Sequence, residues 1–267
     1  MKKIAIVTGG SSGIGLEIVK ALIKCGYFVY TISRRAFSEF EKTESVHFSA
    51  DVSDDAALKK VVDEIWQKEK RLDLLVCAAG FGISGAVEFT VIEEAHKQFD
   101  VNFFGTFFAL RNVSNYMRLQ GFGRILVLSS IAGEIAIPFQ GFYSASKAAV
   151  GKLIESFRAE VEPFGISCAL ILPGDTATPF TEMRRKSAAG DDIYGGRIEK
   201  SISKMEADEV NGMSAKKLGE FVAALACKKK IKFLYPYNRS YAFLLFLYRI
   251  FPRQFALYII KKIYAGG

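Results

Sequence analysis

The chain has 267 residues, half of them hydrophobic, which is enough to bury a full core without disulfides or structural metals. Its only histidines, His47 and His96, argue against a histidine-based metal site, and we expect no metal. The four cysteines, at positions 25, 77, 168 and 227, form no CxxC pair; we interpret them as small buried residues in a reducing compartment. Neither a secretory signal nor an uncharged apolar run of about twenty residues is visible, which favours a cytoplasmic protein.

Strand and helix patterns alternate along most of the chain. Short apolar runs predict strands buried on both faces, at 3–8, 28–32, 46–49, 72–77, 124–129 and 167–172. Longer patterns between them predict helices at 13–24, 55–70, 93–119 and 143–164. This alternation predicts an α/β fold in one domain, a doubly wound parallel sheet (Rossmann fold) with helices on both faces.

The composition changes after this alternating region. Residues 175–211 are polar and contain three glycines, and we interpret them as a lid over a substrate site. Ser214 is a plausible N-cap for a last helix ending at Cys227, and 231–235 predict a seventh strand. We therefore expect the dinucleotide-binding domain to span 1–235, with 236–267 as a helical extension of the same domain.

A glycine-rich turn joins the first predicted strand to the first predicted helix. Glycines allow a tight turn and a close approach to a pyrophosphate, and a helix N-terminus offers unpaired N–H groups and a positive dipole end. Because the turn lies between a strand and a helix, it predicts a dinucleotide site rather than a plain loop. The expected contacts are Gly9, Ser11, Ser12, Gly13, Ile14 and Gly15.

The end of the second predicted strand bears on the choice of nucleotide. An NAD site places an acidic residue there for the ribose 2′-hydroxyl, but this chain has Ser33, Arg34 and Arg35. Guanidinium groups bind a 2′-phosphate that an acid would repel. The alternative is a solvated basic loop, and we expect NADP(H) rather than NAD.

Tyr143 and Lys147 lie four residues apart, on one face of a predicted helix, and Ser130 lies at the carboxyl end of a predicted strand. A carbonyl needs a proton donor beside its oxygen while hydride moves to its carbon. An ammonium about 5 Å from a phenol stabilises the phenolate by roughly 3 kcal/mol, which lowers the phenol pKa by about two units. These three residues are therefore candidate catalytic groups.

Several motifs in register resemble the short-chain dehydrogenase/reductase family. They are Thr8-Gly9-x-x-x-Gly13-x-Gly15, Asp51-Val52, Ala78-Ala79-Gly80, Asn102, Ser129-Ser130, Tyr143-x-x-x-Lys147 and Pro173-Gly174. The match covers roughly the first two thirds of the chain, and residues 82–90 together with 99–104 look like the hydroxysteroid/retinol dehydrogenase-like branch. The resemblance implies an oxidoreductase that interconverts a ketone and a secondary alcohol by hydride transfer with NADP(H).

The resemblance also implies residue roles. Tyr143 would be the general acid/base, Lys147 would bind the nicotinamide ribose and lower the Tyr143 pKa, Ser130 would bind the substrate oxygen, and Asn102 would hold a relay water. Further cofactor contacts would be Asp51, Val52, Ala78, Ala79, Gly80, Pro173, Gly174, Thr176 and Thr178. Two departures from the usual family residues are Thr176 and the motif Cys77-Ala78-Ala79-Gly80, where the family has Asn-Asn-Ala-Gly. The helices 93–119 and 143–164 resemble those with which the family forms homodimers and homotetramers.

The substrate side is rich in apolar residues. They favour a lipophilic substrate, such as a steroid, a retinoid or a long-chain ketone, although such residues are also common in ordinary cores. Open alternatives are a 3-oxoacyl-carrier-protein reductase, a small polar carbonyl reductase and a non-catalytic NADP-sensing protein; nucleic acid is not an expected partner. The candidate pocket residues are Phe81, Ile83, Ile135, Ile137, Phe139, Phe142 and Phe180.

The C-terminal end carries the basic character. Residues 210–267 hold eleven lysines and arginines and one acid, so this segment has a charge of +10 against +8 for the chain. We expect two aromatic-rich helices separated at Pro252. Basic residues among Tyr, Phe and Leu favour peripheral contact with an anionic membrane, and the alternative is that the extension covers the pocket or a subunit contact.

Overall fold

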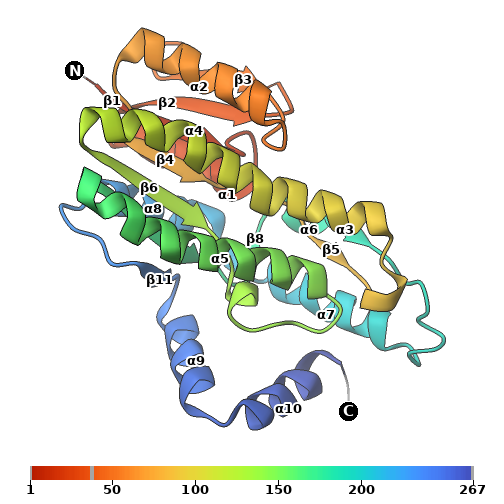
Figure 1. The fold of residues 1–267 in the computed structure, drawn as a ribbon. Helices are drawn as coiled ribbons and strands as arrows, with labels where there is room; N and C mark the ends of the chain where they lie inside the picture. The colour runs from red at the N-terminus through yellow and green to blue at the C-terminus, as the bar shows by residue number, and fades with distance from the viewer. Residues whose placement is uncertain (1, 37–38, 266–267) are drawn as a thin grey trace.

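The computed structural model describes residues 2–36 and 39–265, and at its centre is a seven-stranded parallel sheet (Figure 1). The strand order is β11-β7-β6-β4-β1-β2-β3, so the order reverses between β1 and β4. This is the doubly wound arrangement that the sequence predicts, and its crevice lies at the carboxyl ends of the strands. The strands are β1 (Lys3–Thr8), β2 (Tyr27–Ser33), β3 (Ser45–Ser49), β4 (Leu74–Cys77), β6 (Gly123–Leu128), β7 (Ile166–Leu172) and β11 (Leu234–Pro236).

Helices cover both faces of the sheet and divide the core in two. One face carries α1 (Gly13–Lys24) and α8 (Ala215–Cys227), and the other carries α2 (Asp55–Glu69), α4 (Gly105–Gln120) and α5 (Gly141–Val161). The helices α1 and α8 pack closely, because a Cβ added at Gly219 would lie 2.5 Å from the backbone of Glu17. Central strands such as β4 are buried along their whole length, which explains their unbroken apolar sequence.

The predicted helix 93–119 is helical throughout in the structure, but its winding changes in the middle. It consists of α3 (Ile92–Phe99), a π-helical turn at Asp100–Phe104 and α4. The prediction of one long helix is therefore confirmed, but the π turn within it was not predicted. A π turn inserts an extra residue into the helical repeat, which re-aims the side chains within it and is common at functional sites. Here the turn carries Asn102.

The cysteines also differ from the prediction. Cys77 and Cys168 are buried within the sheet, as expected, but Cys25 and Cys227 are exposed. Cys25 is the C-cap of α1 and Cys227 is the last residue of α8, so both lie at helix ends, outside the core. The expectation that all four are buried is wrong for these two residues.

Shorter elements surround the carboxyl edge of the sheet. Ser214 caps α8, since its hydroxyl accepts a hydrogen bond from Lys217 N, and this helix ends at the predicted residue. Between 175 and 214 the chain forms β8 (Thr176–Ala177), α6 (Phe180–Met183), β9 (Arg185–Lys186), α7 (Arg197–Val210) and β10 (Met213–Ser214). The remaining short elements are β5 (Ile83–Ser84) and the 3-10 turns Val87–Phe89, Ile131–Gly133 and Glu162–Phe164.

The C-terminal extension forms two helices that project from the sheet domain (Figure 1). They are α9 (Arg239–Ile250) and α10 (Arg253–Tyr264), separated at Pro252 as predicted. Leu245 anchors α9, because its side chain is buried against the main core. No helix in the described ranges has both the length and the apolarity needed to cross a bilayer.

Candidate active site

A cavity of about 980 Å³ opens at the carboxyl edge of the sheet. Its position at the reversal between β1 and β4 is where doubly wound sheets bind ligands. Asn102 is the only predicted cofactor residue outside its wall. The others line it: Gly9, Ser11, Ser12, Gly13, Ile14, Gly15, Ser33, Arg34, Arg35, Asp51, Val52, Ala78, Ala79, Gly80, Tyr143, Lys147, Pro173, Gly174, Thr176 and Thr178.

The glycine-rich turn forms one end of the cavity. Gly9 has φ +73°, and a Cβ added to it would lie 2.7 Å from the backbone of Ala79. A Cβ added to Gly15 would lie 2.2 Å from the carbonyl oxygen of Gly9. Only glycine fits both positions. The first turn of α1 has no acidic residue and no side-chain cap from Ser12, so its N–H groups are available to an anion.

Two arginines follow β2 at this end. Arg34 and Arg35 are exposed, and neither forms an ion pair with an acid in the described part of the chain. Arg35 donates to Ser12 Oγ over 3.4 Å, which brings its guanidinium next to the glycine turn. The Asp51 carboxylate is occupied by Ser53, whose N–H and O–H donate to Asp51 Oδ1. This donor set fits a phosphorylated ribose better than a free 2′-hydroxyl.

The candidate catalytic residues come together in the middle of the cavity. Tyr143 lies in the first turn of α5, and the Lys147 Nζ atom lies 6.0 Å from the centre of its ring. Ser130 follows β6, where its Oγ accepts from Ala132 N over 3.1 Å. Lys147 is buried and donates to the carbonyl oxygen of Leu128 over 3.0 Å. The sheet edge and α5 thus hold these three side chains side by side.

The pKa shifts at this cluster differ from the sequence-based expectation. Burial raises the pKa of Tyr143 to about 12, although a hydrogen bond with Ser130 acts in the lowering direction. Burial also lowers the pKa of Lys147 to about 8. We expected Lys147 to lower the Tyr143 pKa by about two units; here the loss of solvent around the phenol outweighs the hydrogen bond with Ser130 and the attraction of the Arg184 guanidinium.

The side chain of Asn102 is engaged by the protein itself. Its Nδ2 donates to Phe81 O and to Ser146 Oγ, both over 3.1 Å, and its Oδ1 accepts from Phe81 N. A Cβ at Gly80 would lie 3.0 Å from Asn102 Oδ1 and 3.5 Å from Lys147 Nζ, so the loop after β4 packs tightly here. The π turn therefore clamps this loop against the catalytic cluster, and the relay water remains a prediction.

The predicted substrate residues divide into two groups. Phe81, Ile135, Ile137 and Phe180 line the cavity, and the Phe180 ring lies 5.8 Å from the Tyr143 ring.

The other three predicted substrate residues, Ile83, Phe139 and Phe142, lie outside its wall and surround a small separate hollow. Ile83 is buried in β5, and Phe139, at φ +60°, packs its ring on Tyr194. These three are thus packing residues in this structure, so the prediction that they line the substrate pocket is not met.

The C-terminal helices form one wall of the cavity, although none of their residues was predicted to line it. Their apolar character was visible in the sequence, but the sequence left open whether they cover the pocket. Polar and charged lining residues were also missed, among them Lys97, Gln140, Asp175, Arg185 and Glu209. From the extension, the cavity is lined by Tyr241, Leu244, Leu247, Tyr248, Phe251, Phe255, Ala256, Ile259, Ile260, Ile263 and Tyr264.

Tyr241 ties this wall to the loop after β7. Its O–H donates to Asp175 Oδ2 over 2.9 Å, and its oxygen accepts from Asp175 N over 3.1 Å. A Cβ at Gly174 would lie 2.0 Å from the Tyr241 ring, so the ring rests directly on the glycine. At the far end of the extension, the Lys204 ammonium of α7 lies 6.0 Å from the Tyr264 ring. The extension therefore spans the cavity mouth from β7 to α7.

Known proteins share this architecture. The family model described as short chain dehydrogenase matches residues 3–189. A 3-ketodihydrosphingosine reductase of Bacteroides thetaiotaomicron is 36% identical over 233 residues, with 86% of each chain covered. A probable short-chain type dehydrogenase/reductase of Helicobacter pylori, VdlC, is 35% identical with 98% of each chain covered. The solved structure described as ElxO with NADP bound has a TM-score of 0.76 at 25% identity, covering 91% of this chain and 99% of that one.

Proposed function

Because this chain belongs to the short-chain dehydrogenase family and is thereby an oxidoreductase of CH–OH and C=O groups, we propose that it reduces a long-chain ketone with NADPH. The observation that carries the proposal is the shared cavity. One wall has the Tyr143, Ser130 and Lys147 cluster beside the glycine turn, and the opposite wall is the apolar face of α9 and α10. The site thus combines a redox centre with room for an extended apolar chain.

In the proposed mechanism, the protein supplies the proton and orients the carbonyl. Tyr143 O–H donates to the carbonyl oxygen and gives up its proton as that oxygen gains charge, and Ser130 O–H donates a second hydrogen bond to the same oxygen. Lys147 stabilises the phenolate that remains. The nicotinamide, when bound, supplies the hydride to the carbonyl carbon. The forward reaction therefore adds one hydride and one proton and leaves a secondary alcohol.

The proposed positioning groups surround this cluster. Asn102 holds the loop after β4 and, as its family role implies, the water that reprotonates Tyr143. Lys147 also binds the ribose hydroxyls beside the nicotinamide. Thr178 and the backbone after Pro173 hold the nicotinamide end. Support for these roles comes from the lining of one cavity by Thr178, Pro173 and Lys147.

The proposed cofactor is NADP(H). The guanidinium groups of Arg34 and Arg35, which pair with no acid in the described ranges, support a 2′-phosphate site, and Arg35 reaches Ser12 of the glycine turn. Solved relatives carry NADP. The residues of the glycine turn and of α1 would hold the pyrophosphate through backbone N–H groups. Asp51 and Val52 would flank the adenine.

The chemistry of the substrate is proposed from the extension and from the relatives. A long-chain ketone is favoured over a steroid or retinoid because relatives named 3-ketodihydrosphingosine reductase match the chain from Bacteroides to cattle. The test is a panel in which NADPH oxidation is followed with 3-ketodihydrosphingosine, a steroid ketone, a 3-oxoacyl carrier protein and a small polar ketone. Equal or faster turnover of the small ketone would overturn the proposal.

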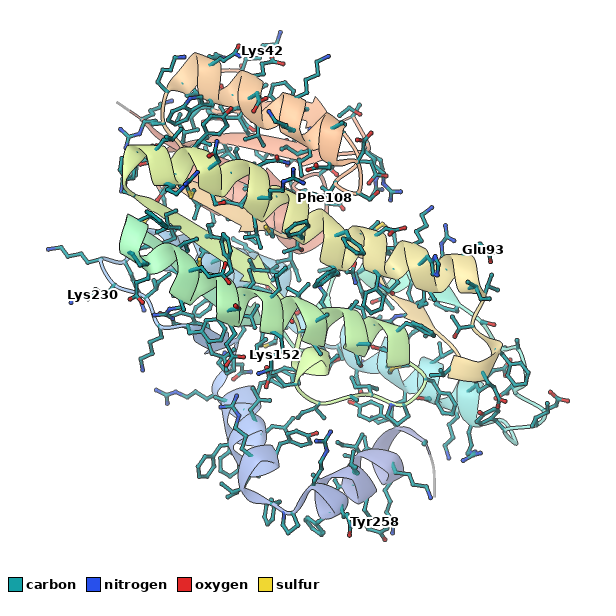
Figure 2. All side chains as sticks on the ribbon, viewed as in Figure 1. Lys42, Glu93, Phe108, Lys152, Lys230 and Tyr258 are labelled. Carbon is teal, nitrogen blue, oxygen red and sulfur yellow. The ribbon has the colours of Figure 1, made fainter. Side chains whose placement is uncertain are left out.

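We also propose that the extension rests on a membrane surface. Its outer face exposes apolar side chains that do not line the cavity, namely Phe243, Phe246, Ile250, Leu257 and Tyr258. Figure 2 shows Tyr258 on the side of α10 that faces away from the sheet. Exposed Arg253, Lys261 and Lys262 supply charge for anionic lipids.

Vesicle sedimentation tests this placement. The chain should sediment with phosphatidylglycerol-containing vesicles, and the double variant Phe246→Ser/Ile250→Ser should not. Equal sedimentation of both proteins would overturn the membrane contact.

The further proposals are a homodimer or homotetramer through α4 and α5, and closure of 175–211 as a lid over the substrate.

A further inference from the structure

The carboxylate of Asp175 lies in the cavity wall without a cation of its own. In the described part of the chain, no lysine, arginine or histidine nitrogen lies within 4 Å of it. Its side chain accepts a hydrogen bond from the neutral hydroxyl of Tyr241. Burial raises the pKa of Asp175, as expected for a desolvated carboxylate that no positive charge compensates.

The neighbouring acids contrast with Asp175. Glu209, which also lines the cavity, pairs with the buried Arg184 and accepts from Thr181 Oγ1 over 2.6 Å. Asp208 pairs with Lys204 over 3.1 Å. Each of these two carboxylates therefore has a cation of its own, whereas Asp175 has none within ion-pair distance among the described residues.

Asp175 is also close to the reacting atoms. It follows Gly174 at the end of β7, in the same loop as the proposed nicotinamide contacts, and its charge acts on the pKa of Tyr143. On its other side, Tyr241 connects it to the apolar wall of the extension. Asp175 thus belongs to the same cavity wall as Tyr143 and is joined directly to the extension that would hold the chain of a ligand.

Resting on the proposed function, we infer that Asp175 binds a cationic head group of the substrate, an ammonium next to the ketone, while the extension holds the apolar chain. A half-buried carboxylate without a counter-ion loses part of its hydration, and an ammonium donating to it offsets that loss. The other oxygen, Oδ1, receives no side-chain hydrogen bond from the described residues and is available for this bond. The substrate class is thus a long-chain amino ketone rather than a neutral lipid.

Matched substrates test the inference. The kcat/KM of the wild-type protein with NADPH is measured for 3-ketodihydrosphingosine, for its N-acetyl derivative and for octadecan-3-one. A charge-assisted hydrogen bond predicts a preference of about tenfold to a hundredfold for the free amine over both neutral ketones. Asp175→Asn keeps an acceptor for Tyr241 but removes the negative charge. In this variant, kcat/KM for the free amine should lie within about threefold of that for the neutral ketones. Asp208→Asn removes the same charge nearby and should keep the preference.

A binding measurement makes the test independent of the variant's folding. Dodecylamine should inhibit the wild-type protein at least about tenfold more tightly than dodecanol when octadecan-3-one is the substrate. Equal turnover of amine and neutral ketones, or equal inhibition by the two dodecyl compounds, would overturn the head-group site while leaving ketone reduction intact. Failure to reduce any long-chain ketone would overturn the proposed function and this inference with it.

Discussion

The two walls of the cavity are built by different means. The nucleotide wall depends on backbone: Gly9 and Gly15 fit where no side chain does, and the first turn of α1 presents N–H groups. The wall from the extension depends on side chains, with rings and aliphatic groups from α9 and α10 facing inward. Backbone recognition suits a constant cofactor, whereas a wall of side chains can be varied for a particular substrate. The predictions below test this division between cofactor and substrate.

The largest of these effects is expected on kcat, when Lys147 beside the nucleotide wall is replaced. Lys147→Met removes the ammonium while keeping the length of the side chain. The variant should lose about a hundredfold to ten-thousandfold in kcat, since the phenolate formed on Tyr143 is no longer stabilised. Steady-state NADPH oxidation measures kcat, and thermal melting controls for the buried Leu128 hydrogen bond. A kcat within threefold of the wild-type value would remove Lys147 from the mechanism.

The next effect separates the two nicotinamide cofactors. Arg34→Ala/Arg35→Ala should lower kcat/KM for NADPH by about a hundredfold and leave that for NADH within threefold, because only NADPH has the 2′-phosphate. The same assay with each cofactor measures both values. Lys42→Ala, a charge change on the exposed segment before β3, is the matched control. Parallel losses with both cofactors would contradict a 2′-phosphate site.

A pH profile tests the charge of Lys147. Burial lowers its pKa to about 8, so the charged form is lost as the pH rises through that value, while Tyr143, with a pKa of about 12, stays protonated. Reductive kcat/KM should therefore fall about tenfold per pH unit above roughly pH 8. In Lys147→Arg, the pH above which kcat/KM falls should move to a higher value, because arginine stays charged. A profile that is flat to pH 10 would contradict the assignment.

The smallest effect concerns the contact between the two walls. Tyr241→Phe removes both hydrogen bonds to Asp175 but keeps the ring on Gly174. The variant should raise the KM for a long-chain ketone about threefold to tenfold and lower the free energy of unfolding by about 1 kcal/mol. Tyr258→Phe, on the outer side of α10, is the control and should change neither. An unchanged KM for Tyr241→Phe would show that the extension does not position the substrate.

The fold and the nucleotide wall could be predicted from sequence because their signals are local. Most strand ends predicted from apolar runs lie within two residues of the ends in the structure. For the first strand, Lys3–Thr8, both predicted ends are the observed ones. The glycine turn has a fixed spacing that only a few backbone conformations satisfy. Hence the predicted residues of this wall gathered in one cavity.

The second wall depends on contacts between distant segments. The inward face of α9 is set by Tyr241 on Asp175, a pairing 66 residues apart that no local pattern encodes. The π turn at Asn102 was missed because an insertion of one residue leaves the apolar pattern of a long helix almost unchanged. The raised Tyr143 pKa was missed because burial depends on the whole cavity, whereas sequence spacing shows only the Lys147 partner.

The central claim is that Tyr143 transfers the proton next to a bound nicotinamide. The most direct measurement is single-turnover reduction of 3-ketodihydrosphingosine by Tyr143→Phe, together with NADPH binding followed by fluorescence titration. We predict a loss of at least about a thousandfold in the reduction rate and an NADPH Kd within threefold of the wild-type value. A near-normal rate in this variant would contradict the account.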